Sequence, residues 1–275
     1  MKRRTVRALI SVIVLLWLVI AFLPFFFMIV TSLKEQKEVF SGSVFRLPQR
    51  FYLGNYWEIL TTGTIFRYLM NSVTVVGVSL VLTLAASAGA AYPLARFVFR
   101  AKPALNLVVL AGMAIPLHAT LIPVFLLSKN IKLYDTLWAL VGPYVAFNIP
   151  MSAFILTGFM KSIPREMDEA AEIDGCGRFR AFFQVILPLS APGMSTLAIY
   201  NSVMMWNEFI FALVLTQSTS VRTLPLSIWE YQGQYTANQP MILAALTLIA
   251  LPIVFAFILG QERLIKGMMA GAVKG

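Results

Sequence analysis

The stretch that decides the fold runs from Lys161 to Pro192 and reads KSIPREMDEAAEIDGCGRFRAFFQVILPLSAP. It separates two long apolar segments and holds five of the chain's twelve acidic residues. Ser162 is placed to cap a first helix, with Pro164 in its first turn and the acids near the positive end of its dipole. Gly175 predicts a break, and an amphipathic second helix starts at Arg178. We therefore expect two short helices joined by a tight turn, forming an exposed projection to which a partner protein can bind.

The composition around this stretch is that of an integral membrane protein. The chain has 275 residues, of which 59% are hydrophobic and 12% are charged, whereas soluble domains carry about 25% charged residues. The net charge of +10 indicates basic loops beside anionic lipid headgroups. Nucleic-acid binding is not expected, because no polar face combines Lys and Arg with interleaved aromatic residues. The one cysteine, Cys176, cannot form an internal disulfide, and we interpret it as a small residue that fills the turn.

Six apolar runs are long enough to cross the roughly 30 Å of hydrocarbon in a bilayer. The expected spans are 9–32, 70–95, 104–127, 137–160, 195–216 and 241–259, with the acidic stretch 161–192 between the fourth and the fifth. We expect them to form one all-α, polytopic domain over residues 1–275. The first run is interpreted as a retained span, because a signal peptide has a shorter apolar region and a small-residue cleavage site.

The distribution of Lys and Arg indicates how the spans are oriented. Six spans put both termini on one side, together with the stretch 161–192. The segments on that side carry fourteen of the 22 Lys and Arg residues, and the opposite side carries eight. Because basic residues concentrate in cytoplasmic loops, we expect both termini and the acidic stretch to lie in the cytoplasm.

Four anchor points in the acidic stretch resemble the EAA loop of the membrane-spanning subunits of ABC importers. They are Glu169-Ala170-Ala171, Gly175, Val185-Ile186 and Leu187-Pro188. In that family the loop forms the coupling helix, which docks in a cleft of a cytoplasmic ATPase. The resemblance implies a type I importer permease with six transmembrane helices in the cell membrane of a bacterium or archaeon. It assigns docking of the ATPase to Glu169, Ala170, Ala171, Gly175, Leu187 and Pro188.

Within that family, the chain most resembles the smaller permease subunit of maltose-type carbohydrate importers. The stretches that carry this likeness are Asn71-Ser72, Trp206-Asn207-Glu208-Phe209, Thr223-Leu224-Pro225-Leu226 and the tail from Lys266 to Gly275. The likeness implies a sugar or oligosaccharide as cargo. It also implies a second permease subunit in a heterodimer, two ATPase subunits and an extracytoplasmic solute-binding protein. The loop 217–239 is expected to reach the binding protein, and the tail 266–275 is expected to contact the ATPase.

Polar side chains inside the apolar runs are candidates for the translocation path. Glu208 is the only acidic residue well inside such a run, where a charge costs roughly 2.5–3.5 kcal/mol on insertion scales. It either lines the path together with Asn148, Asn201 and Asn207, or it pairs with a polar group of a neighbouring helix. His118 is expected to be a hydrogen-bonded packing residue, since a zinc site needs three or four ligands.

The sequence also lacks the motifs of several enzyme classes. It contains no P-loop, no H-E-x-x-H and no G-x-S-x-G motif, so we expect no catalytic residue, metal or cofactor in this chain. ATP and Mg are expected in the partner ATPase. The main alternative is a secondary transporter that is driven by an ion gradient and uses Glu208, although the two halves of the chain show no internal repeat.

Overall fold

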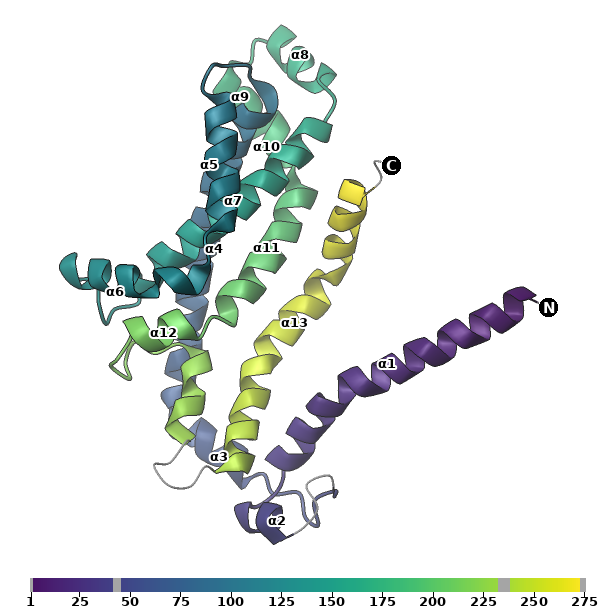
Figure 1. Cartoon of the computed structure of the whole chain (residues 1–275), viewed down its shortest axis with the longest axis vertical. Helices are drawn as coiled ribbons and strands as arrows, with labels where there is room; N and C mark the ends of the chain where they lie inside the picture. Colours follow the sequence, from purple (N-terminus) through teal and green to yellow (C-terminus); the bar gives the residue numbers. More distant parts are fainter. Residues whose placement is uncertain (1, 42–45, 232–237, 273–275) are drawn as a thin grey trace. The chain divides into compact units, whose positions relative to one another are not determined.

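A computed structural model describes residues 2–41, 46–231 and 238–272 of the chain (Figure 1). The described residues form helices and connections, without any strand. Their contacts divide the chain into two units. The first unit comprises residues 1–67 and 225–252, and the second comprises residues 68–224 and 253–275.

In the first unit, a long apolar helix is joined to a short connecting segment. Its helices are α1 (Lys2–Ser32), α2 (Gln36–Ser41) and α3 (Gly54–Thr61). The apolar side chains of α1 are largely exposed, as expected of a helix that faces lipid. The side-chain amide of Asn55 donates to the carbonyl oxygens of Ser32 (2.8 Å) and Lys34 (2.9 Å), so α3 is fixed to the end of α1.

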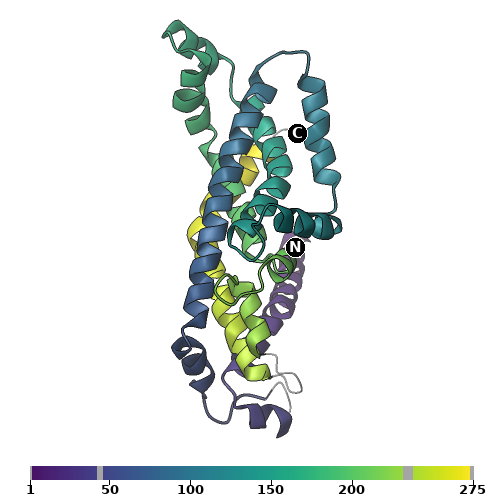
Figure 2. The ribbon, with the colours of Figure 1, turned by 90° about the vertical axis from the view of Figure 1, so that its left-hand side faces the viewer.

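The remaining helices belong mainly to the second unit, and α4, η3 and α13 continue across its boundaries. They are α4 (Thr64–Arg96), α5 (Lys102–Ala114), η1 (Leu117–Thr120), α6 (Leu121–Asn130), α7 (Trp138–Ser162), α8 (Glu166–Ile173), α9 (Arg178–Ala181), η2 (Phe182–Ile186), α10 (Leu187–Leu189), α11 (Ala191–Trp206), α12 (Ile210–Leu215), η3 (Leu224–Tyr231) and α13 (Gln239–Ala272). Figure 2 shows α4 as one long, unbroken helix. Among the described residues, four helices are long and apolar enough to cross a membrane, or up to six if each bent helix pair is one span.

Two of the expected spans contain breaks. The axis turns by 92° between α5 and the segment that contains η1 and α6. Pro116 and the residue before it, Ile115, lie at this break, and both have an extended backbone. The extended backbone of Ile115 is expected, because a proline disfavours helical geometry in the residue that precedes it. Residues 207–209 separate α11 from α12 within the expected span 195–216. At the other end of the chain, α13 continues to Ala272, where the sequence indicated a polar tail after residue 259.

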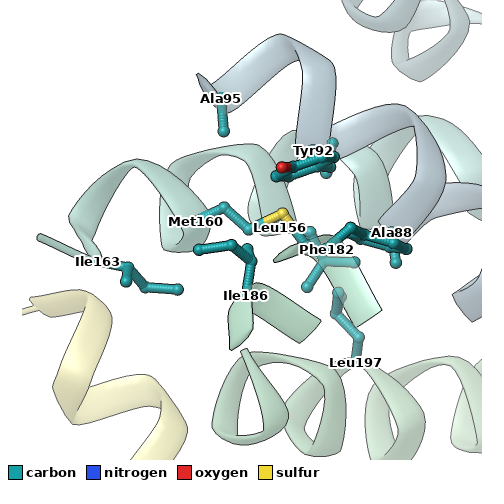
Figure 3. Packing of buried hydrophobic residues seen from close by; sticks show 10 residues of the cluster. Ala88, Tyr92, Ala95, Leu156, Met160, Ile163, Phe182, Ile186 and Leu197 are labelled. Carbon is teal, nitrogen blue, oxygen red and sulfur yellow. The ribbon is translucent and has the colours of Figure 1, made fainter. Parts of the chain in front are cut away.

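The core of the second unit joins the apolar helices to the acidic stretch (Figure 3). Its buried residues are Ala88, Ala91, Tyr92 and Ala95 from α4, Leu156, Met160 and Ile163 from α7 and the residue after it, Phe182 and Ile186 from η2, and Leu197 from α11. The alanines of α4 allow the neighbouring helices to approach closely. The second half of the stretch 161–192 is therefore packed into the helix bundle, whereas α8 lies outside this core.

Candidate functional site

The first helix of the acidic stretch, α8, starts later than the sequence predicts. It begins at Glu166, and its first turn contains Glu166, Asp168 and Glu169. The hydroxyl of Ser162 donates to the carbonyl oxygen of Phe159 at 2.7 Å. Ser162 therefore ends α7, and the prediction that it caps α8 is wrong. The predicted order of a helix, a turn and a second helix is observed, with the acids near the positive end of α8.

Gly175 makes the turn that ends α8. Its φ angle is +78°, a left-handed conformation that glycine adopts without the clash of a Cβ atom. The N–H of Gly175 donates to the carbonyl oxygen of Glu172 (3.0 Å), and the N–H of Cys176 donates to that of Ala171 (2.8 Å). This pair of bonds is the Schellman motif, which closes a helix and reverses the chain.

The residues of the EAA-like motif have different environments. Glu169 and Ala170 are exposed, and the Glu169 carboxylate has no hydrogen-bond or ion-pair partner among the described residues. Ala171 is buried, so its small side chain allows α8 to pack against the body of the unit. Leu187 is half-buried against the core cluster, whereas Pro188 is exposed. The surface open to a partner thus includes Glu169, Ala170 and Pro188, while Ala171 and Leu187 contribute to packing.

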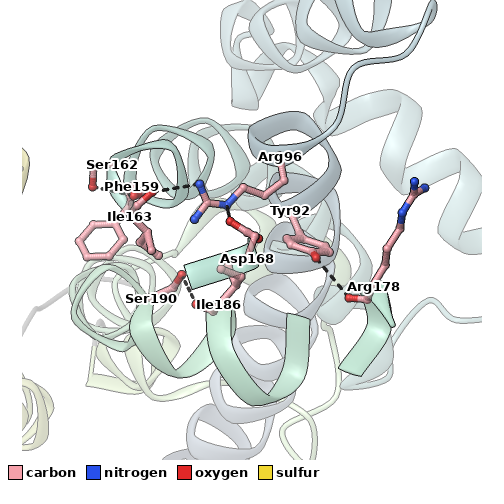
Figure 4. A network of polar contacts seen from close by, with 9 residues as sticks. All are labelled: Tyr92, Arg96, Phe159, Ser162, Ile163, Asp168, Arg178, Ile186 and Ser190. Atoms are coloured by element: carbon pink, nitrogen blue, oxygen red, sulfur yellow. Dashed lines mark hydrogen bonds and ion pairs between the residues drawn. The ribbon is translucent and has the colours of Figure 1, made fainter. Parts of the chain in front are cut away.

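An ion pair attaches α8 to the last residue of α4 (Figure 4). Nε of Arg96 lies 3.1 Å from Oδ2 of Asp168, and the two side chains are only 5% and 29% exposed. Nη1 of Arg96 also donates to the carbonyl oxygen of Ile163 at 3.0 Å. One buried guanidinium therefore holds both α8 and the segment that leads into it. In the sequence, Arg96 looked only like the basic end of an apolar run, and its partner lies far along the chain.

The same end of α4 also holds the second half of the acidic stretch. The hydroxyl of Tyr92 donates to the carbonyl oxygen of Arg178 at 3.2 Å. The guanidinium of Arg178 lies over the ring of Phe97, 4.9 Å from its centroid, in a cation–π contact. The carboxyl end of α4 thus contacts the acidic stretch both before and after the turn at Gly175.

The amino-terminal part of α4 holds a different segment, the loop 217–224. The side-chain amide of Asn71 donates to the carbonyl oxygens of Ser220 (2.9 Å) and Arg222 (2.8 Å). The hydroxyl of Ser72 accepts a hydrogen bond from the N–H of Leu224 at 2.8 Å. Two stretches that carried the resemblance to carbohydrate importers, one at Asn71 and one at Leu224, therefore contact each other directly.

Asp135 holds the beginning of the same loop. Its carboxylate accepts hydrogen bonds from the N–H groups of Gln217 (2.7 Å) and Ser218 (2.8 Å) and from the Ser218 hydroxyl. Burial acts to raise the pKa of Asp135, but these hydrogen bonds and the nearby charge of Arg222 outweigh it. The pKa of this carboxyl therefore lies below its ordinary value, and the charged form stabilises the loop.

Glu208 lies between a cavity with mainly apolar walls and the start of α12. Oε1 accepts a hydrogen bond from the N–H of Phe211 (2.8 Å), and Oε2 accepts from the N–H of Ala212 (3.1 Å) and from the hydroxyl of Tyr144 (3.0 Å). The carboxylate thus satisfies the free N–H groups at the start of a helix. Glu208 and Asn148 also line a cavity of about 340 Å³, whose other lining residues include Tyr144 and Tyr200. The contact with Tyr144 is a pairing with a polar group of a neighbouring helix, one of the two roles that the sequence left open for Glu208. Its role in a translocation path stays a prediction.

The other two path candidates do not line this cavity. Asn201 is fully buried and donates from its side-chain amide to the hydroxyl of Ser152 at 2.9 Å. Asn207 is exposed, and its amide donates to the carbonyl oxygen of Val203, one turn back along the chain. The structure therefore brings Glu208 and Asn148 together and places Asn201 in a contact between helices. Tyr144 was not predicted, because tyrosines are common in apolar runs and give no signal of such a role.

His118 lies at the break between α5 and α6, and its side chain is exposed. The prediction of a hydrogen-bonded packing histidine is wrong for the described chain, because the chain turns by 92° at Pro116 and leaves the His118 side chain exposed. Among the described residues, no group of three or more His, Cys, Asp or Glu side chains is placed to hold a metal ion.

Comparison with known proteins identifies the family. Residues 81–269 match the family described as "Binding-protein-dependent transport system inner membrane component". The chain is 52% identical over 259 residues to a putative ABC transporter permease protein of Caldicellulosiruptor sp. (strain Rt8B.4), a match that covers 94% of each chain. It is 34% identical over 252 residues to the sulfoquinovosyl glycerol transport system permease protein SmoH of Agrobacterium fabrum, covering 92% of this chain and 88% of that one.

A solved structure shows the same fold. It is a bacterial ABC transporter involved in the import of the acidic polysaccharide alginate, and one of its chains superposes on this chain with a TM-score of 0.81 at 19% identity. The superposition covers 95% of this chain and 97% of that chain. Sequence and fold therefore agree, and the chain belongs to the family of binding-protein-dependent inner membrane components, as a permease subunit of an ABC importer.

Proposed function

We propose that this permease subunit imports a sugar or oligosaccharide and that α8 is the coupling helix by which an ATPase drives it. The cargo is proposed because a relative that matches nearly the whole chain is named for sulfoquinovosyl glycerol. The solved transporter of the same fold imports alginate, which is also a carbohydrate. A transporter driven by an ion gradient is not favoured, since the family works with binding proteins and ABC importers.

The observation that carries the coupling proposal is the two-sided character of α8. On one side, Asp168 and Ala171 attach the helix to its own chain, while on the other side Glu169 and Ala170 are exposed. A carboxylate without a partner can accept charge-assisted hydrogen bonds from Lys or Arg of a docking protein. Two apolar side chains, Ile173 (86% exposed) and Phe179 (84% exposed), lie near the same turn and suit a pocket on that protein. Gly175, Leu187 and Pro188 would maintain the shape of this surface.

The cavity beside Glu208 suits a segment of a path for sugars. It combines apolar walls with a few polar residues, namely Glu208, Asn148 and two tyrosines. This mixture is typical of sites for small molecules, in which a few placed polar groups select the ligand. Because Glu208 is held by hydrogen bonds to α12, it would present a fixed acceptor to sugar hydroxyl groups.

The complete importer would contain further subunits. We propose a second six-span permease, two cytoplasmic ATPase subunits that bind ATP and Mg, and a solute-binding protein on the outer face. Both termini would lie in the cytoplasm, and the loop 217–239 would contact the binding protein. Of the segments concerned, residues 232–237 and 273–275 lie outside the described part of the chain. Closure of the ATPases on ATP would move α8 and shift the spans from an inward-facing to an outward-facing state.

A purification experiment tests this proposal. The tagged chain is expressed with its neighbouring subunits and purified in mild detergent, as wild type and as Glu169→Arg. Glu35→Arg, which reverses another exposed charge, between α1 and α2, is the control. We expect the ATPase to accompany the wild type and the control and to be lost from Glu169→Arg. A wild-type chain that purifies without an ATPase would contradict the importer assembly, and retention of the ATPase by Glu169→Arg would contradict docking at α8.

A further inference from the structure

We infer that α4 transmits movement between α8 and the loop 217–224, with Arg96 and Asn71 as the joints at its two ends. The inference rests on the proposed function in one respect, that an ATPase moves α8. All the contacts involved lie within the second unit of the chain. Arg96 and Asn71 are therefore assigned as positioning residues of the transport cycle, although neither faces the proposed path or the exposed side of α8.

The joint with α8 is suited to carry force. Arg96 is the last residue of α4, and its buried guanidinium contacts Asp168 within α8 and Ile163 before it. A charge contact in a poorly solvated site is much stronger than one in water, so a displaced α8 pulls on the end of α4. Nε and Nη2 of Arg96 and Oδ2 of Asp168 are buried and make no hydrogen bond among the described residues, so the ion pair is a charge contact without one. The carboxylate thus engages one edge of the guanidinium, which allows α8 to tilt without breaking the pair.

The segment of α4 between Asn71 and Arg96 is a continuous helix. From Asn71 to Arg96, α4 rises by about 37 Å at 1.5 Å per residue, more than the thickness of the hydrocarbon core. Three small polar residues on one face of the helix, Ser79, Thr83 and Ser87, are completely buried, so this face is closely packed along much of its length. Pro93 lies inside α4 only three residues before Arg96. We therefore expect the helix before it to move as a unit, so that a movement at one end reaches the other.

The joint at the other end is made with the backbone of the loop. Asn71 donates to two carbonyl oxygens, those of Ser220 and Arg222, and the Ser72 hydroxyl accepts from the N–H of Leu224. These three bonds hold the loop on both sides of Val221, so the loop follows α4 when α4 moves. If this loop meets a binding protein, as proposed above, α4 links the state of the ATPases to the state of that contact.

The experiment uses the complete importer in lipid nanodiscs, with a spin label at the exposed loop residue Thr219. ATP with vanadate traps the ATPases in their closed state. The variants are Asp168→Asn, Arg96→Lys and Asn71→Ala. The control, Glu172→Gln, removes an exposed charge from the same helix that holds Asp168. Each sample is measured for trapped nucleotide and for the change that trapping causes in the spectrum of the label.

We expect a clear spectral change in the wild type and in Glu172→Gln. In the three joint variants, the change should fall by about fivefold or more, the lower end of the range typical of coupling between sites, while the amount of trapped nucleotide stays the same. In the double variant Asp168→Asn/Asn71→Ala, the spectral change should be no smaller than in whichever single variant shows the smaller change. Two contacts that act in series along one helix do not have additive effects.

Two results would overturn the inference. One is a spectral change in Asp168→Asn and Arg96→Lys that is as large as in the wild type. The other is a loss of trapped nucleotide in these variants because the ATPase leaves the complex. That result would mean that the ion pair serves the docking surface alone. A wild-type complex that traps no nucleotide would instead contradict the proposed function itself, so the two failures can be distinguished.

Discussion

The two ends of α4 hold their partners by different chemistry. At the carboxyl end, a buried guanidinium holds α8 through one carboxylate and one carbonyl oxygen. At the amino end, the uncharged side chains of Asn71 and Ser72 hold the loop 217–224 through its backbone. A charge contact depends weakly on angle, whereas hydrogen bonds to the backbone are directional and fix the shape of a segment. The comparison indicates that α8 is attached so that it can tilt, while the loop is held in one conformation.

The largest effect is expected from removing the charge at the α8 end. Arg96→Met leaves the Asp168 carboxylate and the Ile163 carbonyl oxygen without their partner. Because Asp168 is partly exposed, the cost should be about 2–3 kcal/mol, below the range for a fully buried pair. The measurement is the free energy of unfolding in mixed micelles titrated with SDS. Arg165→Met, an exposed position directly before α8, is the control and should change it by less than about 0.5 kcal/mol. If Arg96→Met and Arg165→Met change the free energy of unfolding equally, the ion pair between Arg96 and Asp168 adds no stability.

At the other end of α4, Asn71→Ala should have a somewhat smaller effect. The substitution leaves the carbonyl oxygens of Ser220 and Arg222 without a donor, at a cost of about 1–2 kcal/mol. The same titration measures the stability, and proteolysis of the loop 217–224 measures its local opening. Asn130→Ala removes the same side chain from an exposed position at the end of α6 and should leave both unchanged. Faster proteolysis in both variants would argue against a specific role of Asn71.

A third prediction concerns the turn that separates the two contacts of α4 with the acidic stretch. Gly175→Ala introduces a Cβ atom at a φ of +78°, which costs about 1 kcal/mol. Gly177 has a φ of −66° and open space where a Cβ would lie. Gly177→Ala is therefore a matched control that should be neutral or slightly stabilising. If the two alanine variants are equally stable in the SDS titration, the left-handed turn is not a requirement of the stretch.

Local patterns in the sequence were sufficient for the main architecture. The apolar runs indicated the long helices, and the acids together with Gly175 indicated a helix that ends in a tight turn, because these features depend on neighbouring residues alone. The ion pair between Arg96 and Asp168 escaped prediction since its members lie on different helices, and basic residues are common at the ends of spans whether or not they form ion pairs. Pro116 lies inside the expected span 104–127, and the 92° turn it accompanies depends on how the flanking helices pack.

The residues of the EAA-like motif illustrate the same limit. The motif predicted a functional surface, yet it did not indicate which of its alanines is exposed. Ala170 is exposed and Ala171 is buried, a difference that depends on the face by which α8 packs on its chain. Glu208 is a similar case, because its bonds to Tyr144 and to the start of α12 require the break at residues 207–209.

The smallest effect is expected for Asp135, a charged group that holds the loop 217–224, and it depends on pH. The pKa of Asp135 is lowered in the folded chain by its hydrogen bonds to Ser218 and Gln217. Its contribution is therefore fully present above the ordinary pKa of an aspartate, about 4, and is lost as the pH falls through the lower folded value. A label at Thr219 should become more mobile only below about pH 4 in the wild type. In Asp135→Asn, which keeps an acceptor oxygen but cannot titrate, the mobility should be the same at pH 7 and pH 3, while Glu35→Gln should retain the wild-type transition. A transition that persists in Asp135→Asn would show that another group controls the loop.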